Sequence, residues 1–328
     1  MPKTLFIVGA GASSEFGLPL GSALASEIRG RLQDELRNGL SSHRLLMDGA
    51  MASGTSGDWG LAAKELAGGL ISARSIDRLL DSRSSNPLVV ELGKFSIAQV
   101  IAEKERNSHL SENYHGDWDK THDGLTAAAT TWIGTLFSIL QEGIRPENAH
   151  KIFADTAFIT FNYDRLIERY FRLAFQHILF LPPKDAIAIA DCIQVEHVYG
   201  SLGKLDSNLN PSAPFGVMDE LVRYTVRSFR TFTEGGESGQ LEVIRDAVKT
   251  AELIVFVGFA FDPLNLDALF DQQLSPGQKV CATTIGMGDS ELARVRSRLG
   301  LSGTNFMMAN SLCADFIRSD GFRAFLNH

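Results

Sequence analysis

Cysteine is scarce in this sequence, which has three cysteines among its 328 residues. Cys192, Cys281 and Cys313 lie far apart, and no two of them form a C-x-x-C pair. This spacing disfavours a zinc ribbon and a disulfide framework, so we expect buried, reduced thiols and no bound metal. Long apolar runs are also missing, since no stretch reaches the ~18 residues that a membrane span needs. With no signal-peptide pattern, the sequence predicts a cytoplasmic protein without membrane contact.

Positive charge is in short supply as well. Lys and Arg number 31 against 39 Asp and Glu, which gives a formal net charge of −8. An acidic balance disfavours a broad nucleic-acid-binding surface, and no direct nucleic-acid binding is expected. The hydrophobic fraction of 44% and the charged fraction of 21% are typical of a globular protein and exclude a mostly disordered chain.

Apolar runs alternate with helical patterns in the first 37 residues and again from about residue 155. The predicted strands cover residues 5–8, 157–160, 194–199, 253–258, 279–285 and 305–308. The predicted helices cover residues 22–37, 163–175, 241–250, 264–272, 290–299 and 311–326. Continuous apolar strands are typical of a sheet buried on both faces. The alternation therefore predicts an α/β protein with a Rossmann-like, doubly wound parallel sheet.

The middle of the chain lacks this alternation. Apolar residues recur at helical spacing over residues 86–102 and 125–140, whereas residues 108–123 have the Gly and Asp content of a loop. A chain of this length exceeds the usual ~100–200 residues of one domain, which favours a discontinuous arrangement. We predict a Rossmann domain made of residues 1–37 and 151–328, interrupted by a helical insertion at residues 38–150.

A glycine turn, Gly9-Ala10-Gly11-Ala12-Ser13-Ser14, follows the first predicted strand. Between a buried strand and a helix, such a turn lets backbone N–H groups approach a phosphate. The dinucleotide fingerprint G-x-G-x-x-G is incomplete, because Ser14 stands at its sixth position. The acidic residue expected about 20 positions on is also misplaced, since Glu27 falls in a predicted helix. Both mismatches disfavour a dehydrogenase.

Three further predicted strands end in small or polar residues. The clusters are Asn162-Tyr163-Asp164, then His197 with Gly200-Ser201, then Gly258-Phe259 with Asp262. Asn162, Asp164 and Asp262 can each cap a helix, and His197 can be a hydrogen-bonded residue of a buried strand. Ligands of open parallel sheets, however, bind at the carboxyl ends of the strands. Coincidence of all the clusters at one sheet edge favours a binding site.

The succession GAGAS, FNYD, HVYGS and VGFAFDPLN resembles the SIR2-like, or sirtuin-related, NAD-binding domains. It is most similar to their bacterial anti-phage defence type, over residues 3–30 and 156–265. The run at residues 75–80 also resembles a recurrent helix motif of that family, and Ser75 is expected to cap this helix. The resemblance implies that the substrate NAD contacts Gly9, Ala10, Gly11, Ala12, Ser13, Asn162, Asp164, Gly200, Ser201, Gly258, Phe259 and Asp262.

The resemblance also implies a reaction. The paired C-x-x-C motifs of the deacylases are missing, and residues 20–22 read Leu-Gly-Ser where a deacylase has Asp-Phe-Arg. The expected activity is therefore NAD+ hydrolysis to nicotinamide and ADP-ribose, without zinc or another metal. Asn162 would orient the ribose or the attacking water, Asp164 would accept from the carboxamide N–H, and His197 would act as a base.

An unregulated NAD-hydrolysing enzyme would deplete its own cell. The resemblance to defence systems implies a homo-oligomer gated by a partner protein such as a HerA-like ATPase, with contacts through the insertion and the last helix. Other functions stay open. They are an NAD- or ADP-ribose-binding regulatory module without turnover, and an ADP-ribosyl cyclase or transferase that shares the first step.

Overall fold

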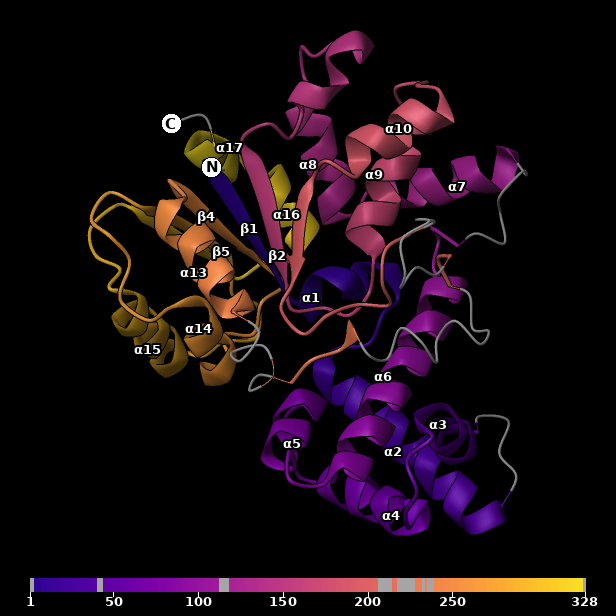
Figure 1. Cartoon of the computed structure of the whole chain (residues 1–328). Coiled ribbons are helices and arrows are strands. Elements are labelled where there is room, and N and C mark those ends of the chain that lie inside the picture. The colour runs from indigo at the N-terminus through magenta and orange to yellow at the C-terminus, as the bar shows by residue number, and fades with distance from the viewer. Residues whose placement is uncertain are drawn as a thin grey trace.

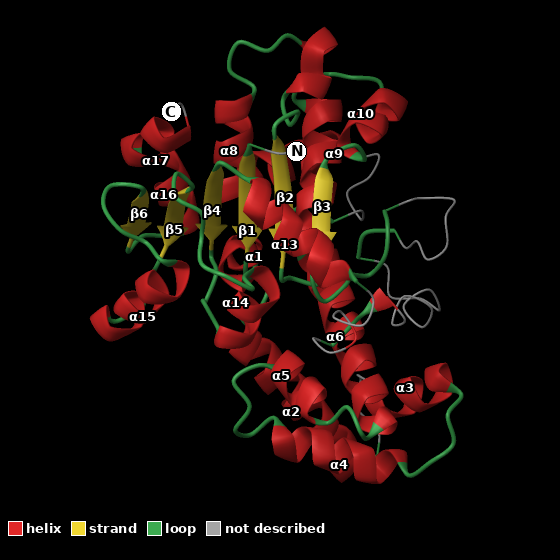
Figure 2. Ribbon diagram, turned by 60° about the vertical axis from the view of Figure 1, so that its left-hand side comes forward, coloured by secondary structure: helices red, strands yellow, loops and turns green. Residues whose placement is uncertain are grey.

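A computed structural model describes residues 3–39, 44–111, 118–205, 214–216, 228–231, 234 and 239–326. Its core is a sheet of six parallel strands in the order β3-β2-β1-β4-β5-β6 (Figure 2). The strands are β1 (Thr4–Val8), β2 (Thr156–Thr160), β3 (Gln194–His197), β4 (Leu253–Val257), β5 (Lys279–Thr283) and β6 (Phe306–Ala309). This is the strand order of a doubly wound Rossmann sheet, and the predicted fold class is confirmed.

Helices cover both faces of the sheet. Before β2 come α1 (Ala10–Ser13), α2 (Gly21–Asn38), α3 (Leu45–Ser53), α4 (Trp59–Gly69), α5 (Ile76–Ser82), α6 (Pro87–Asn107), α7 (Trp118–Ala129) and α8 (Trp132–Leu140). After β2 come α9 (Leu166–His177), α10 (Pro183–Ala190), α13 (Gln240–Thr250), α14 (Pro263–Leu269), α15 (Asp289–Leu299), α16 (Cys313–Arg318) and α17 (Asp320–Leu326). The crossovers thus bury the sheet between helical layers.

Alternate residues of β1 belong to two different cores. Leu5 and Ile7 pack on the face covered by α13, α14 and α15, whereas Phe6 and Val8 pack on the face covered by α8, α9 and α16. Every residue of β2 and β4 is buried, which explains why these strands read as continuous apolar runs. β3 lies at an edge and is half-exposed.

The helices α2 to α6 gather below the carboxyl ends of the strands (Figure 1). Within this group α2 packs on α4, and α3 and α4 both pack on α6. In contrast, α8 packs on α16 and belongs to a core of the sheet. The segment between β1 and β2 therefore supplies both a separate helical group and part of the covering layer. The domain boundaries at residues 37 and 150 stay a prediction.

Two predicted helices are broken in the structure. The helix expected over residues 125–140 is split into α7 and α8, because Glu15 accepts a hydrogen bond from the N–H of Trp132 (2.7 Å) and so begins a new helix there. The same carboxylate accepts from the N–H of Ala314 in α16 (2.9 Å). The predicted last helix is split at Ser319, whose hydroxyl accepts from the N–H of Phe322.

Two smaller expectations are also corrected. α7 begins at Trp118, inside the predicted loop 108–123. Cys281 and Cys313 are buried as expected, but Cys192 is exposed, because it lies in the turn between α10 and β3.

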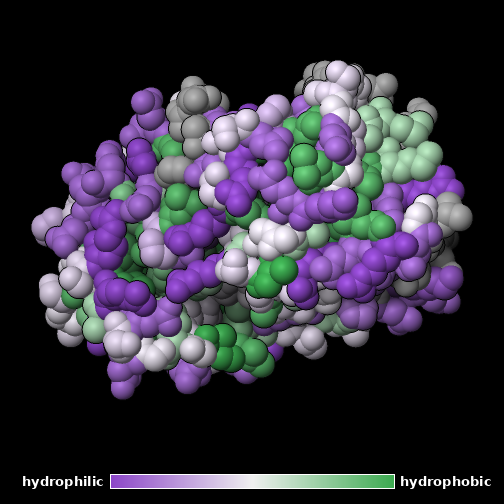
Figure 3. Space-filling model, turned by 90° about the horizontal axis from the view of Figure 1, so that it is seen from below, coloured by the Kyte–Doolittle hydropathy of each residue, from purple (hydrophilic) through white to green (hydrophobic). Residues whose placement is uncertain are grey.

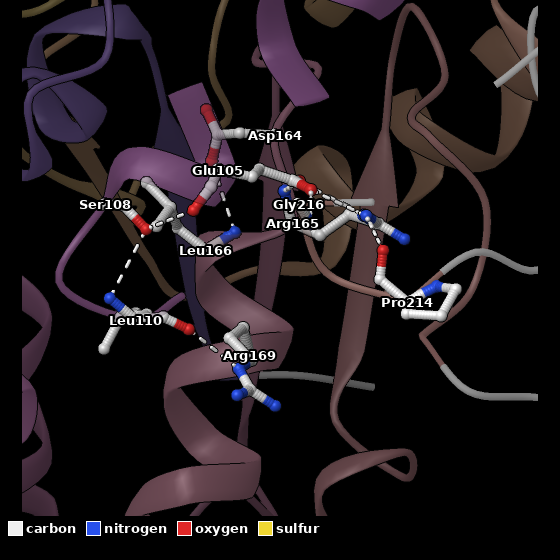
Figure 4. Close-up of polar contacts among 9 residues, drawn as sticks. All are labelled: Glu105, Ser108, Leu110, Asp164, Arg165, Leu166, Arg169, Pro214 and Gly216. Carbon is white, nitrogen blue, oxygen red and sulfur yellow. Dashed lines mark hydrogen bonds and ion pairs between the residues drawn. The ribbon is translucent and has the colours of Figure 1, made fainter. Parts of the chain in front are cut away.

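A buried ion pair joins the end of α6 to the start of α9 (Figure 4). The side chains of Glu105 and Arg165 are 0% and 1% exposed, and the Nη2 of Arg165 lies 2.6 Å from Oε2 of Glu105. The backbone N–H and Nε of Arg165 donate to Oε1 of Glu105 at 2.9 and 3.1 Å. Glu105 also accepts from the N–H of Gly216, and Arg165 donates to the carbonyl of Pro214. The pair is thus satisfied on both sides.

Replacing one partner of this pair leaves the other charge buried. We expect Glu105→Ala to lower the free energy of unfolding by about 3–5 kcal/mol, the usual cost of breaking a buried ion pair from one side. Denaturant unfolding measures the change. The control is Arg318→Ala, which removes an exposed pair with Asp315 and should leave the unfolding midpoint almost unchanged. A Glu105→Ala variant as stable as this control would contradict the structural role.

Candidate functional site

A cavity of about 700 Å³ opens at the carboxyl edge of the sheet, within the range of about 300–1,000 Å³ typical of small-molecule sites. It lies at the ends of β1, β2 and β4, where the strand order reverses between β1 and β4. Its walls also include residues of α2, α5, α14 and α15. Of the predicted contact residues, those in the lining are Gly9, Ala10, Gly11, Ser13, Asn162, Asp164, Gly258, Phe259 and Asp262. Ala12, His197, Gly200 and Ser201 lie outside it.

The glycines of the turn are required by backbone packing. A Cβ on Gly9 would lie 2.5 Å from the carbonyl oxygen of Gly258, and one on Gly11 would lie 2.9 Å from it. Gly258 itself has φ +61 and its Cβ would meet the N of Ala12 at 2.1 Å. Only glycine allows the β1 and β4 ends to approach this closely.

Several N–H groups of the turn are occupied by this packing. The N–H of Gly9 donates to Val257, that of Gly11 to Gly258, and that of Ala12 to Gly9. Ala10 is the first residue of α1, so its N–H has no intrahelical acceptor. Ala10 also lines the cavity. The turn therefore presents the N–H of Ala10 to a ligand, and not a full row of amides.

Asn162 ties the end of β2 to the glycine turn. Its Nδ2 donates to the carbonyl of Gly9 (3.0 Å) and to Oγ of Ser13 (2.7 Å). Its backbone N–H donates to Oγ1 of Thr160, the last residue of β2. Both amide hydrogens are used for positioning, which leaves Oδ1 as the polar atom that the side chain can offer to a ligand.

Asp164 is the buried carboxylate of the same segment, with 6% of the residue exposed. Burial raises the pKa of its carboxyl from 3.8 to about 6, although hydrogen bonds from Ser13 and from the N–H of Leu166 act in the other direction. Nearby Glu105 also raises this pKa, and His197 lowers it. Asp164 is therefore a group that lines the cavity and titrates near neutral pH.

The ring of His197 contacts the main chain of Asn162 and does not line the cavity. Its Nδ1 lies 2.9 Å from the carbonyl oxygen of Asn162, and its Nε2 lies 2.9 Å from Oε1 of Glu168. Gly200 lies in the turn after β3, has φ +79 and packs against the carbonyl of Ser228. His197 thus supports the segment after β2 from the neighbouring strand, whereas Gly200 and Ser201 contact Ser228.

The loop after β4 forms another wall of the cavity. Phe261 has φ +53, a conformation that costs free energy for a bulky residue, and its ring packs on Phe256 and Phe259. Asp262 accepts from the N–H of Leu264 (2.9 Å) and caps α14, the helix-capping role that its sequence position also allows. Asp262 also accepts from Nη2 of Arg78 on α5 (3.1 Å).

The sequence did not single out Asp77, although it lies in the run at residues 75–80 whose helix and Ser75 cap are confirmed. Asp77 lines the cavity and accepts a short hydrogen bond from the hydroxyl of Tyr163. Burial raises the pKa of Asp77 to about 6. Together with the Arg78–Asp262 contact, this hydrogen bond joins α5 to the ends of β2 and β4. Sequence reasoning also missed Glu168, which occupies a polar position of an amphipathic helix.

Within the residues that the structure describes, no cluster of three or more His, Cys, Asp or Glu side chains is arranged to hold a metal ion. No helix among these residues is long and apolar enough to span a membrane.

Two glycine substitutions test the packing of the turn. We expect Gly9→Ala to lower the free energy of unfolding by about 1–3 kcal/mol, because its Cβ would overlap the backbone of Gly258 and Phe259. Gly30 lies inside α2 with open space around it, so Gly30→Ala should raise the free energy by about 0.5–1 kcal/mol. Denaturant unfolding of both variants gives the comparison. The same sign for both would show that the turn tolerates a side chain.

The raised pKa of Asp164 predicts a pH dependence of stability. Between about pH 4 and about pH 6 the folded protein holds a proton on Asp164 that the unfolded chain releases, so this group destabilises the fold as pH rises. Asp164→Asn keeps the shape and removes the titration. The unfolding free energy of the variant should gain up to about 3 kcal/mol on that of the wild type from about pH 4 to about pH 8. Parallel pH curves would contradict the raised pKa.

The chain matches no protein-family model and no curated protein. Its function is therefore inferred from the cavity, from the side chains that line it and from the motifs that supply them.

Proposed function

We propose that the cavity binds NAD+ and that the protein hydrolyses it to nicotinamide and ADP-ribose. The observation that carries the proposal is the joint position of Asn162 and Asp164. Both are buried, both line one cavity at the switch point of the sheet, and both contact Ser13 of the glycine turn. A dinucleotide site of a Rossmann sheet is expected at this place.

The cavity fits a dinucleotide in size and in chemistry. It is larger than a single nucleotide base needs, and its lining combines apolar side chains with a few polar groups. Phe161, Phe259 and Leu266 supply apolar surface for a planar ring, whereas Asn162, Asp164 and Asp77 supply acceptors for hydroxyl and amide hydrogens. Ala10 offers its backbone N–H to a phosphate.

The chemistry demands little of the protein besides positioning. A bound NAD+ supplies a cationic leaving group that departs as neutral nicotinamide. Asn162 is held by Gly9 and Ser13, so its Oδ1 has a fixed direction for a ribose hydroxyl or a water molecule. Asp164, once ionised, accepts the proton that the attacking water loses. Hydrolysis therefore converts NAD+ and water to nicotinamide, ADP-ribose and one proton.

The biological setting rests on the resemblance to defence-associated domains. It favours an NAD-depleting effector whose activity is gated by assembly, as a homo-oligomer or with a HerA-like ATPase. Figure 3 views the molecule from below, and hydrophilic residues cover most of that face, with hydrophobic residues in small separate patches. Met47, Met51 and Leu61, on α3 and α4, are among the exposed apolar side chains of the protein. None of these surface features identifies a partner, so the partner is proposed from the sequence motifs alone.

The first experiment incubates the full chain with NAD+ and separates the products by chromatography. We expect nicotinamide and ADP-ribose, and a loss of turnover of at least about 100-fold in Asn162→Ala, because a misplaced reacting group costs about that much. Asn305→Ala is the matched control, since Asn305 is exposed and lies at the amino end of β6. His197→Ala tests the residue that supports Asn162.

The remaining functions are outcomes of the same experiment. A cyclic product, or transfer to an added acceptor, would replace hydrolysis by a cyclase or transferase reaction. NAD+ binding in calorimetry without turnover, with and without a co-expressed partner, would establish a regulatory module. A wild-type protein that neither binds nor cleaves NAD+ would refute the proposal.

A further inference from the structure

His197 lies between two groups that can only accept hydrogen bonds. Its Nδ1 faces the main-chain carbonyl of Asn162 and its Nε2 faces the carboxylate of Glu168, each at 2.9 Å. A neutral imidazole carries one N–H and can satisfy one acceptor, whereas an imidazolium carries two. With Glu168 ionised, both contacts are hydrogen bonds only when His197 is charged.

The surroundings favour the charged form. The side chain of His197 is 10% exposed and that of Glu168 is 28% exposed, so the pair is only weakly screened by water. Burial lowers the pKa of His197, but Glu168, together with the hydrogen bond to the carbonyl of Asn162, raises it, and the net pKa is raised. Burial raises the pKa of Glu168, but His197 and its other neighbours lower it, and the net pKa is lowered. Asp164 also raises the pKa of His197, and Arg165 lowers that of Glu168.

The backbone of His197 is held separately from its ring, because its carbonyl accepts from the N–H of Gly200 at 3.1 Å and from a side chain of α13. Nε2 of Gln240 donates to the carbonyl of His197 at 2.8 Å. This bond holds the backbone of β3's last residue and leaves the ring contacts unchanged. The ring is thus fixed by Asn162 on one side and by Glu168 on the other.

We infer that Glu168 is a positioning residue for the proposed NAD+ cleavage: it keeps His197 charged, and His197 holds the main chain of Asn162 in place. A chain of contacts then runs from Glu168 through His197 and Asn162 to Gly9 and Ser13 in the turn. The inference rests on the proposed function for its catalytic consequence, but not for the charge of His197.

The arrangement changes the expected role of His197. A charged ring whose two N–H groups are donated to Asn162 and Glu168 has no lone pair for a proton, and His197 lies outside the cavity lining. The proton acceptor assigned to the cavity is then Asp164. Glu168 does not line the cavity, yet through His197 it sets the geometry of Asn162, which does.

A titration of the histidine side chains by NMR tests the charge without any substrate. The full chain is measured as wild type and as Glu168→Gln, and the His197 signal is assigned from its loss in His197→Gln. We expect His197 to carry two ring N–H groups at neutral pH, and its titration midpoint to fall by roughly 1–3 pH units in Glu168→Gln. Glu242→Gln is the control, because Glu242 is exposed on α13.

A second variant separates charge from folding. Glu168→Asp retains the carboxylate, so the midpoint should stay nearer the wild-type value than in Glu168→Gln. A neutral His197 in the wild type at pH 7, or an unchanged midpoint in Glu168→Gln, would overturn the inference. The titration needs no NAD+, so it gives a result even if the wild-type protein does not cleave NAD+.

The kinetic consequence is measured on NAD+ with the same variants. We expect kcat to fall at least about tenfold in Glu168→Gln, KM to stay within about threefold, and Glu168→Asp to recover part of kcat. Equal kcat in Glu168→Gln and wild type would show that the pair is structural only. A wild type without NAD+ cleavage would refute the proposed function and leave the titration result to stand on its own.

Discussion

The buried ion pair between Glu105 and Arg165 is the contact on which the candidate site most depends. A carboxylate and a guanidinium that are both withdrawn from water must face each other with their remaining hydrogen bonds satisfied. Glu105 belongs to the last turn of α6, and Arg165 lies between Asp164 and the start of α9. The same contact therefore fixes the helical group below the sheet and the chain segment that carries Asn162 and Asp164.

A second constraint acts between β1 and β4. The two strand ends approach so closely that three glycines are needed, and the N–H groups of Gly9 and Gly11 bind the turn to the end of β4. The turn is thus rigid, and Asn162 is attached to it through Gly9 and Ser13. Three segments far apart in the sequence become one rigid wall, against which α5 places Asp77 through its bond to Tyr163. Such rigidity suits a site whose main task is to orient a substrate.

The sequence predicts most of the sheet and less of the helices, for physical reasons. β1, β2 and β4 are buried on both faces, so their apolar runs depend on no particular neighbour. The break between α7 and α8 depends on Glu15, which is more than 100 residues away, and no local pattern shows it. In contrast, the position of Asn162 and Asp164 in the cavity lining is predicted by the rule that ligands bind at the carboxyl ends of strands. The direction of the His197 ring and the part played by Glu168 follow only from packing between β3 and α9.

The two ion pairs on either side of Asp164 have opposite effects on it. Glu105 raises its pKa, His197 lowers it, and burial accounts for most of the rise to about 6. Each pair compensates its own charge, so neither supplies a full opposite charge that would return the pKa of Asp164 to its ordinary value. At neutral pH such a carboxylate is mostly ionised, yet it holds a proton more readily than an exposed aspartate. In the proposed reaction Asp164 accepts a proton from water and then releases it to solvent, and that intermediate affinity suits both steps. Burial of the carboxylate, with Glu105 and His197 acting on it in opposite directions, gives Asp164 this property.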